Sequence, residues 1–224
     1  MSTRTAVFTG TFDPLTLGHL DVVRRGSALF DGLIVAVGVN PSKAMLFDVG
    51  ERVELARVVV APYKNVRVEA FDGLAVQFVR KVGARVILRG VRSLTDMEYE
   101  FSMTLTNARL APEVETVFLM ADGEYSHVSS SLIKQIAQYG GEADLERFVP
   151  AELIGPIMAK MRALGESRLR LRDELVHDLP RHVGQPEIAP LEAVGQASMV
   201  EAEQLQDRRV EIIRVDRLVD DIPA

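Results

Sequence analysis

The first 164 residues alternate between short runs of β-branched and apolar residues and longer amphipathic stretches, and this alternation constrains the fold more than any other feature. The short runs predict strands, and several are apolar on both faces, as strands covered by helices on each side are. A helix between consecutive strands makes a crossover connection, which joins parallel strands in a right-handed sense. We therefore expect an α/β fold with a Rossmann-like, five-stranded parallel sheet and helices on both faces.

The predicted strands are Thr5–Thr9, Leu33–Val39, Val66–Ala70, Arg85–Leu88 and Glu115–Leu119. The predicted helices are His19–Phe30, Gly50–Ala61, Gly73–Val82, Thr95–Leu110 and Ser129–Tyr139. Ligands of such sheets bind beyond the carboxyl ends of the strands. The residues that follow each strand are therefore the first candidates for a functional site.

The sequence after Leu164 differs in composition from the sequence before it. All nine Phe, all four Tyr and all five Lys lie before Gly165, and the last 60 residues carry 13 acidic residues against eight Arg. Because aromatic side chains supply much of the buried area of a core, we expect one folded domain over residues 1–164. Residues 165–224 would then form a C-terminal extension, poorly ordered or accessory.

Three interpretations of this extension remain open. It is a disordered or partly ordered segment, which its prolines and lack of aromatics favour, or an interaction segment, or an extension without a selected function. Its sequence is compatible with helices at Glu166–Leu179 and Met199–Leu205 and with a strand at Val210–Val215.

The composition excludes several functional classes. The absence of cysteine rules out a disulfide framework, a thiolate zinc site, an iron–sulfur cluster and a cysteine nucleophile, and four scattered His residues leave little for an all-protein metal site. The net charge of −6 argues against a general nucleic-acid-binding surface. The N-terminus lacks the apolar region of a signal peptide, and no apolar stretch approaches the roughly 20 residues of a membrane span. We therefore expect a soluble cytoplasmic protein without nucleic-acid or membrane partners.

The loop after the first strand has the composition of an anion-binding site. In Thr9–His19 (TGTFDPLTLGH), Gly10 allows a tight turn and a close ligand, Pro14 stiffens the loop, and a helix begins near Gly18. A helix start presents unpaired N–H groups and the positive end of the helix dipole, and His19 can donate a hydrogen bond to a bound anion. The alternative is an ordinary strand–turn–helix with His19 on the surface, and the generic pattern alone favours that alternative.

A second helix start follows the fifth strand. Ser129, Ser130 and Ser131 precede an apolar-periodic stretch, a position at which serine caps a helix. The same residues place hydroxyl and N–H groups at the helix N-terminus, where anions bind. Capping alone and anion binding are both open for these serines.

Basic residues follow the second and fourth strands. Arg89 and Arg92 come directly after the predicted strand Arg85–Leu88, and their guanidinium groups match the geometry of phosphate. The alternative is a pair of surface arginines that form salt bridges with the acidic run Asp96–Glu100. Lys43 follows the second strand, and a single loop lysine is usually only solvated.

These groups converge on one edge of the sheet. Because the carboxyl ends of parallel strands meet there, the basic and hydroxyl groups after strands one, two, four and five share one crevice with two helix N-termini. This combination predicts a polyphosphate ligand. Acidic residues are few, so no multi-carboxylate metal site is evident, and a divalent ion is expected only as a bridge between phosphates.

The order of the motifs resembles that of a known family. Thr9–His19 is similar to the T/H-x-G-H signature of the nucleotidyltransferase superfamily. The complete set resembles the bacterial phosphopantetheine adenylyltransferases, in which Thr9–His19 is followed by Asn40–Lys43 (NPSK), Arg89–Arg92 (RGVR), Asp96–Glu100 (DMEYE), Val117–Met120 (VFLM) and Tyr125–Ser131 (YSHVSSS). Other adenylyl- and cytidylyltransferases share the first motif, whereas the full set is specific, and the likeness covers Thr5 to Leu164.

The resemblance implies adenylyl transfer from ATP to 4′-phosphopantetheine, which gives dephospho-coenzyme A and pyrophosphate in coenzyme A biosynthesis. It implies that His19 is catalytic and binds ATP. The other ATP-binding residues that it implies are Thr11, Phe12, Gly90, Val91, Arg92, Glu100, Tyr125, Ser126, His127, Val128, Ser129, Ser130 and Ser131. The phosphopantetheine-binding residues that it implies are Thr11, Lys43, Ala75 and Arg89. It also implies a homohexamer, and Mg²⁺ bound mainly through the phosphates of ATP.

Three positions depart from the family pattern, and two other functions remain as alternatives. Leu17 stands where many members have Asn, Ala44 where a second basic residue is usual, and His127 where the residue is usually apolar or aromatic. One alternative is transfer to another phosphate acceptor, such as nicotinamide mononucleotide or glycerol phosphate. The other is a nucleotide-binding regulatory module without turnover.

Overall fold

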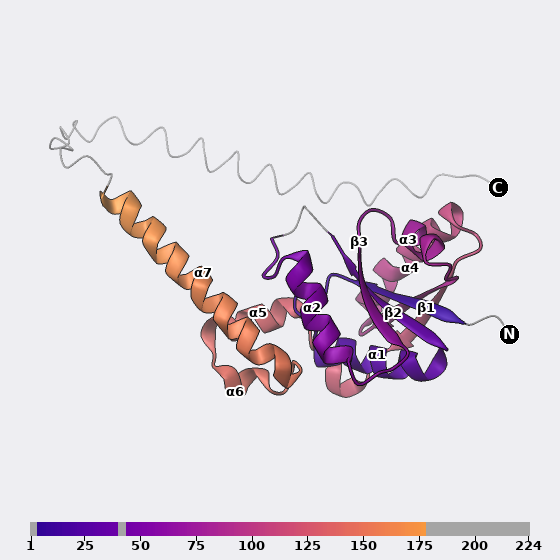
Figure 1. Cartoon of the computed structure of the whole chain (residues 1–224), viewed down its shortest axis with the longest axis horizontal. Coiled ribbons are helices and arrows are strands. Elements are labelled where there is room, and N and C mark those ends of the chain that lie inside the picture. Colours follow the sequence, from indigo (N-terminus) through magenta and orange to yellow (C-terminus); the bar gives the residue numbers. More distant parts are fainter. Residues whose placement is uncertain (1–3, 40–43, 178–224) are drawn as a thin grey trace, which may run out of the picture. The chain divides into compact units, whose positions relative to one another are not determined.

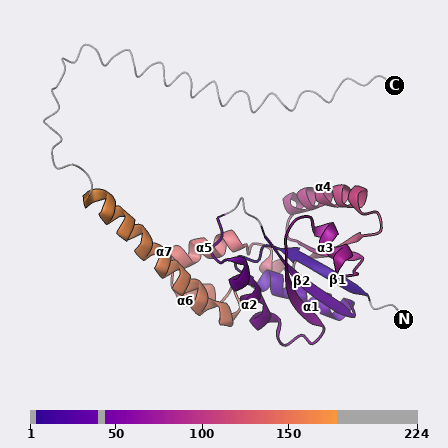
Figure 2. The ribbon, with the colours of Figure 1, turned by 45° about the horizontal axis from the view of Figure 1, so that its top comes forward.

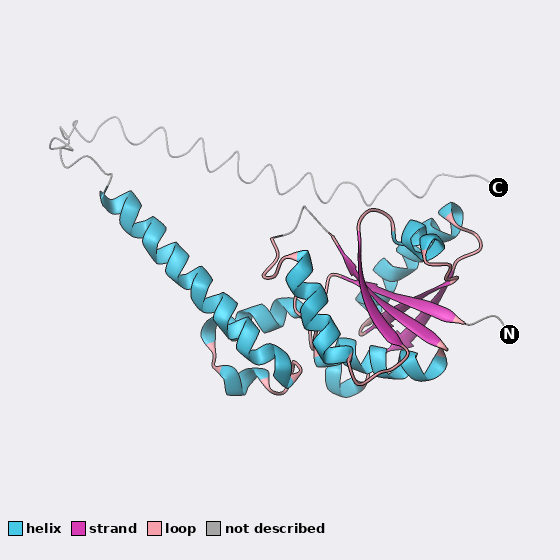
Figure 3. Ribbon diagram, viewed as in Figure 1, coloured by secondary structure: helices cyan, strands magenta, loops and turns pink. Residues whose placement is uncertain are grey.

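The chain forms one parallel sheet with helices on both sides, as the sequence predicts (Figure 3). The computed structural model describes residues 4–39 and 44–177. In this part of the chain the strands lie in the order β3-β2-β1-β4-β5, and every neighbouring pair is parallel. The strands are β1 (Thr5–Gly10), β2 (Gly32–Gly38), β3 (Val66–Phe71), β4 (Val86–Val91) and β5 (Glu115–Met120).

All five helices predicted within residues 1–164 are present, each within about two residues of its expected ends, which is the usual disagreement at helix termini. They are α1 (Leu17–Leu29), α2 (Val49–Val60), α3 (Ala75–Lys81), α4 (Leu94–Leu110) and α5 (Ser130–Tyr139). Three further elements were not predicted: the 3₁₀ turn η1 (Gly123–Tyr125), the short α6 (Glu142–Leu145) and the long α7 (Ala151–His177). Strand β4 also extends three residues beyond its predicted end, so Arg89 and Gly90 lie within the strand and not after it.

The sheet is buried on both faces, which explains its continuous apolar strands. In β1, Ala6 and Phe8 belong to one core cluster and Val7 to the other, because successive side chains of a strand point to opposite faces. The larger cluster is completed by side chains of α1, α2, α5 and α7, and the smaller one by α3. In both ribbon views α1 and α2 lie on one side of the sheet, and α3 and α4 on the other (Figures 1 and 2).

Side-chain caps fix where several helices begin. Thr16, Asp48, Ser93 and Ser129 are N-cap residues whose side chains accept a hydrogen bond from the backbone N–H three residues further on. Such caps satisfy one of the four free N–H groups of a helix start. Thr16 and Ser93 follow β1 and β4 closely in the sequence, so the starts of α1 and α4 are held near the carboxyl edge of the sheet.

The expected domain boundary near Gly165 falls inside α7, which continues without interruption from Ala151 to His177. The described residues up to Asp173 belong to one compact unit. The first part of the expected helix Glu166–Leu179 is therefore the continuation of a longer helix. The expected elements Met199–Leu205 and Val210–Val215 lie outside the described residues, and the division of the chain into residues 1–164 and 165–224 stays a prediction.

Two glycines that lie within helices differ in the space around them, which gives a test of the packing of α1 on the sheet. A Cβ atom at Gly26 would lie 2.7 Å from Cδ2 of the buried Leu88 and 3.3 Å from Cδ2 of the buried Leu33, whereas at Gly155 no heavy atom lies within 4 Å. We expect Gly26→Ala to lower the free energy of unfolding by about 1–3 kcal/mol through overpacking. Gly155→Ala should raise it by about 0.5–1 kcal/mol, because alanine loses less backbone entropy.

Urea unfolding of both variants measures these changes. If Gly26→Ala stabilised the protein as much as Gly155→Ala does, this result would contradict the close packing of α1 against β4.

Candidate active site

A cavity of about 800 Å³ lies at the carboxyl ends of the strands. Residues after β1, β2, β3 and β5, residues of β4, and the starts of α1, α4 and α5 all line it. The lining includes Thr11, Phe12, Gly18, His19, Gly38, Ala75, Arg89, Gly90, Arg92, Asp96, Glu100, Val128, Ser129, Ser130 and Ser131. The cavity therefore lies at the edge of the sheet that the parallel topology predicts for a ligand site.

The buried carboxylate of Asp13 anchors the loop between β1 and α1 to neighbouring segments. This carboxylate is 2% exposed and accepts hydrogen bonds from the backbone N–H groups of Leu46 at 2.8 Å and Phe47 at 2.9 Å. It also forms an ion pair with Lys134 of α5. The Asp13–Pro14 peptide bond is cis, and Phe12 has a φ angle of 48°. Two segments distant in sequence, Leu46–Phe47 and the part of α5 around Lys134, thus fix the shape of this loop.

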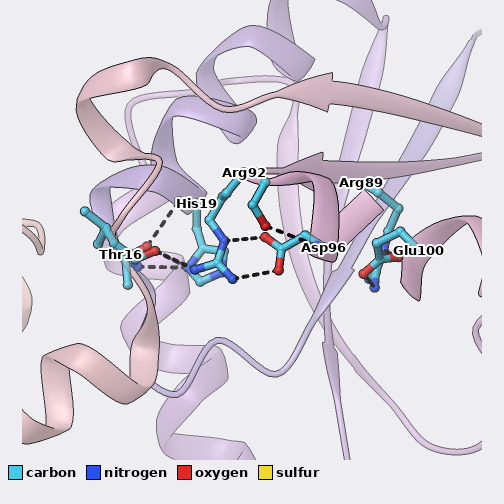
Figure 4. Close-up of polar contacts among 8 residues, drawn as sticks. Thr16, His19, Arg89, Arg92, Asp96 and Glu100 are labelled. Carbon is cyan, nitrogen blue, oxygen red and sulfur yellow. Dashed lines mark hydrogen bonds and ion pairs between the residues drawn. The ribbon is translucent and has the colours of Figure 1, made fainter. Parts of the chain in front are cut away.

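The ring of His19 is oriented by its own helix cap. The backbone N–H of Thr16 donates to Nδ1 of His19 at 3.1 Å, and the Thr16 hydroxyl lies 3.0 Å from the same atom. An atom that accepts from a backbone N–H carries no proton, so in the neutral ring the proton is on Nε2. Capping therefore leaves Nε2–H as the donor that remains for a ligand (Figure 4).

The surroundings of His19 keep its ring neutral. Burial, followed by the positive charges of Arg92 and Arg89, lowers the pKa of His19 from 6.5 to about 4. The ring of Phe12 meets the imidazole edge to face, with 5.2 Å between the ring centroids. At neutral pH the side chain is therefore an uncharged hydrogen-bond donor at the wall of the cavity.

Arg89 is fixed between β1 and α4. Its Nη1 donates to the carbonyl of Thr9 at 2.7 Å and to the hydroxyl of Thr9 at 2.8 Å. Its Nε and Nη2 form a two-point ion pair with the carboxylate of Glu100. A guanidinium group held by a carboxylate on one side and a carbonyl on another has a defined plane.

Arg92 joins α4 to the segment that precedes α5. Its Nε donates to Asp96 at 2.9 Å, and its Nη1 donates to the carbonyl of Val128 at 2.8 Å. Figure 4 shows this arginine beside His19. The salt bridges that the sequence analysis kept as an alternative are thus present, and both arginines nevertheless line the cavity.

The three serines have different surroundings. The hydroxyl of Ser129 accepts from the N–H of Leu132 at 3.1 Å and is the cap of α5. The hydroxyl of Ser130 donates to the carbonyl of Pro14 at 2.9 Å and so connects α5 to the first loop. Among the described residues the hydroxyl of Ser131 has no hydrogen-bond partner, and this serine lines the cavity. Capping therefore accounts for Ser129, and Ser131 is free to contact a ligand.

Several residues implied by the resemblance do not line the cavity. Val91 is fully buried, and Tyr125, Ser126 and His127 lie outside the lining. The ring of His127 meets that of Phe148 edge to face, with 5.9 Å between the centroids. The ligand contacts expected of these four residues stay predictions. Lys43 lies outside the described residues, and its role stays a prediction as well.

Several residues that orient or line the site were not predicted from the sequence. Thr16 precedes His19 by three residues, the spacing of an N-cap and the residue that completes a capping box, and this spacing could have revealed it. Tyr99, Met103 and Asn107 of α4 also line the cavity, at the spacing of one helix face. The buried Arg52 contacts the first loop from α2, and no local pattern in the sequence indicates this contact.

The site offers few ligands for a metal ion. Among the described residues there is no group of three or more His, Asp or Glu side chains that could hold one. The two carboxylates in the lining, Asp96 and Glu100, are each paired with an arginine. Any divalent cation here would depend mainly on oxygens of the bound substrate.

Comparison with known proteins agrees with this geometry. The cytidylyltransferase-like family matches residues 7–136, which span the first loop, both arginines and the serines. A phosphopantetheine adenylyltransferase of Rhodopirellula baltica is 52% identical over 159 residues, which cover 70% of this chain and 89% of that protein. One from Caldanaerobacter subterraneus subsp. tengcongensis is 48% identical over 159 residues, covering 71% and 98%.

The chain belongs to the phosphopantetheine adenylyltransferase family. The family resemblance read from the ordered motifs is thus confirmed.

Solved structures support the fold alone. A nicotinic acid mononucleotide adenylyltransferase of Plasmodium falciparum, complexed with NaAD, superposes with a TM-score of 0.53 at 10% identity and covers 73% of this chain and 96% of its own. A putative nicotinate-nucleotide adenylyltransferase from Vibrio parahaemolyticus gives a TM-score of 0.52 at 17% identity, covering 71% and 96%. The fold of the family is therefore shared with adenylyltransferases of other named substrates.

The lowered pKa of His19 gives a prediction for the free protein. In a ¹H–¹⁵N spectrum of the histidine rings, His19 should show the Nε2–H tautomer and should not titrate between pH 8 and 5.5, because its pKa is about 4. The unfolded chain binds this proton more readily than the folded one, so acidification from pH 6.5 to 4 should lower stability. His19→Asn identifies the ring signals and should reduce this loss of stability. A titration midpoint of the His19 ring at or above pH 6.5 would contradict the lowered pKa of this side chain.

Proposed function

We propose that this protein transfers the adenylyl group of ATP to 4′-phosphopantetheine, giving dephospho-coenzyme A and pyrophosphate in the biosynthesis of coenzyme A. The observation that carries the proposal is a single cavity in which the donor His19, two arginines and the N-termini of α1 and α5 lie together. The named activity of relatives at 45–52% identity supports the same reaction.

The reaction requires positioning more than proton transfer. An oxygen of the phosphopantetheine phosphate forms a bond to the α-phosphorus of ATP. The bond between that phosphorus and the oxygen that bridges it to the β-phosphorus breaks, and pyrophosphate leaves. The attacking group is already an anion, so no general base is needed. The protein must bring two anions together and stabilise the negative charge that develops at the α-phosphate.

Neutral His19 suits the stabilising role. Its Nε2–H is left free by the contact of Nδ1 with Thr16, and the ring needs no protonation to donate a hydrogen bond. A donor held by its helix cap does not have to reorient when charge develops, and this preorganisation lowers the barrier. We infer that His19 donates to a non-bridging oxygen of the α-phosphate.

The cationic side chains divide between the two substrates in this proposal. Lys43 and Arg89 hold the phosphate of phosphopantetheine and reduce its repulsion from ATP, while Ala75 lines the channel for the pantetheine chain. Arg92, together with the start of α5 at Ser129–Ser131, holds the phosphates that leave as pyrophosphate. Thr11 contacts both substrates, and the backbone of Phe12 contacts the nucleotide.

The nucleotide substrate is taken as MgATP. The donor set of the cavity fits a cation that arrives on the phosphates, since the lining carboxylates are engaged by arginines. The cation supplies charge neutralisation at the phosphates, and the chain orients the phosphates that carry it.

An assay of product formation tests the proposed function. The full chain and a version that ends at Leu164 should both form dephospho-coenzyme A from ATP and phosphopantetheine. Nicotinamide mononucleotide and glycerol phosphate, offered in parallel, should not be adenylylated. ATP binding without release of pyrophosphate would favour the regulatory module and would exclude the proposed activity.

His19→Ala should lower kcat by about 10²–10³ with a modest change in ATP affinity, because its hydrogen bond strengthens in the transition state. His177→Ala, at the end of α7, is the matched control and should retain the kcat of the wild type. A variant with normal kcat and a raised KM for ATP would show that His19 contributes only to ground-state binding.

We further propose that the protein acts in the cytoplasm as a homo-oligomer, with the family hexamer as the expected form. None of the described helices is long and apolar enough to cross a membrane. Helix α4 contains no buried residue, although it carries Leu94, Phe101 and Leu105, which are 80%, 57% and 58% exposed. Exposed apolar side chains gathered on one helix support an interaction surface there.

The oligomer can be tested by light scattering after gel filtration. Phe101→Glu and Leu105→Glu alter residues of α4 that do not line the cavity, and they should reduce the mass of the assembly. Val58→Glu changes a similarly exposed apolar residue on α2 and should leave the mass unchanged. A monomeric wild-type protein would exclude the proposed assembly.

A further inference from the structure

Arg52 of α2 is a buried cation without a counter-ion in the described part of the chain. The residue is 3% exposed and forms no ion pair with a described residue, and its Nε is buried without a hydrogen-bond partner. A buried charge is usually paired, because removal from water costs several kcal/mol per ion. Arg52 therefore has an unusual environment that stability alone does not explain.

The contacts of Arg52 lead to the catalytic edge of the sheet. Its Nη1 donates to the carbonyl of Thr11 at 2.6 Å and to the carbonyl of Gly38 at 3.0 Å. Thr11 is the first residue after β1, and Gly38 is the last residue of β2, so the guanidinium group joins the exits of two adjacent strands. Both carbonyl-bearing residues line the cavity, whereas Arg52 lies behind them.

The first of these contacts fixes a peptide group. In a planar trans peptide the C=O and the N–H point in opposite directions, so a Thr11 carbonyl held by Arg52 turns the N–H of Phe12 away from that arginine. Among the described residues no group accepts a hydrogen bond from this N–H, and Phe12 lines the cavity. Phe12 also has a φ of 48°, a conformation that costs energy for a residue other than glycine and requires support from its surroundings.

We propose that Arg52 is a positioning residue for the nucleotide: it orients the Thr11–Phe12 peptide so that the N–H of Phe12 meets a phosphate of ATP, and it places behind that peptide a positive charge that no described carboxylate neutralises. The proposal rests on the proposed function for the identity of the ligand. It differs from a purely structural role because it requires the charge as well as the hydrogen bonds, and because the group that Arg52 orients is the N–H of Phe12, so that its main effect falls on the nucleotide even though Thr11 contacts both substrates.

Direct titration of each substrate into Arg52→Gln and Arg52→Lys, at constant salt and well below each unfolding midpoint, tests this inference. Gln can satisfy one carbonyl but lacks the charge, so its Kd for ATP should rise by about tenfold, the loss expected when a hydrogen-bonded charge is removed. The Kd for phosphopantetheine should stay within about threefold. Lys keeps the charge and several donors, so its Kd for ATP should stay within about threefold of the wild type.

Arg57 on the same helix provides the matched control. Its side chain is 54% exposed and pairs with Glu54, and Arg57→Gln should leave the Kd of both substrates unchanged. The inference is overturned if Arg52→Gln binds ATP as the wild type does, if it weakens both substrates equally, or if Arg52→Lys is no better than Arg52→Gln. A wild-type protein that forms no dephospho-coenzyme A would instead overturn the proposed function, and the ATP titrations would still report on Arg52.

Discussion

The loop between β1 and α1 must keep one shape for the site to exist, and buried charges impose that shape. Asp13 holds it to the N–H groups of Leu46 and Phe47 and to Lys134 of α5, and Arg52 holds the Thr11 carbonyl from α2. Each of these contacts crosses a large separation in sequence. Because polar groups without a partner are expensive inside a protein, the loop cannot leave this arrangement without losing several hydrogen bonds together.

The same loop determines the chemical state of His19. Thr16 ends the loop and caps α1, and its N–H occupies Nδ1, so the tautomer follows from the helix start. Burial and the nearby arginines keep the ring uncharged. A neutral donor beside paired guanidinium groups is suited to a polyanionic substrate, since the positive field attracts the phosphates while the ring stays ready to donate.

Paired arginines and substrate binding are compatible in this structure. Glu100 and Asp96 neutralise part of the charge of Arg89 and Arg92 and define the planes of their guanidinium groups. Arg92 also binds the Val128 carbonyl and thereby places the start of α5 against α4. The two helix starts and the arginines therefore form one rigid wall of the cavity, in which ion pairs supply geometry and the unpaired amides supply binding capacity.

The sequence alone determined the order of strands and helices along the chain, because short continuous apolar runs such as Leu33–Val39 differ clearly from longer amphipathic stretches such as Gly50–Ala61. It also indicated the first loop, the arginines and the serines, whose residue types follow strands of one parallel sheet. Tertiary structure decided what depends on contacts across the chain. The sequence does not distinguish Arg52 from any other helical arginine until α2 packs against Thr11, and Ser130 differs from its neighbours only once its hydroxyl meets the Pro14 carbonyl of the first loop. Local patterns fix secondary structure, the helix cap that sets the tautomer of His19 and the pairing of Arg92 with Asp96 one turn away. Burial, the lowered pKa of His19 and the contacts of Arg89 with Thr9 arise only when distant segments exclude water between them.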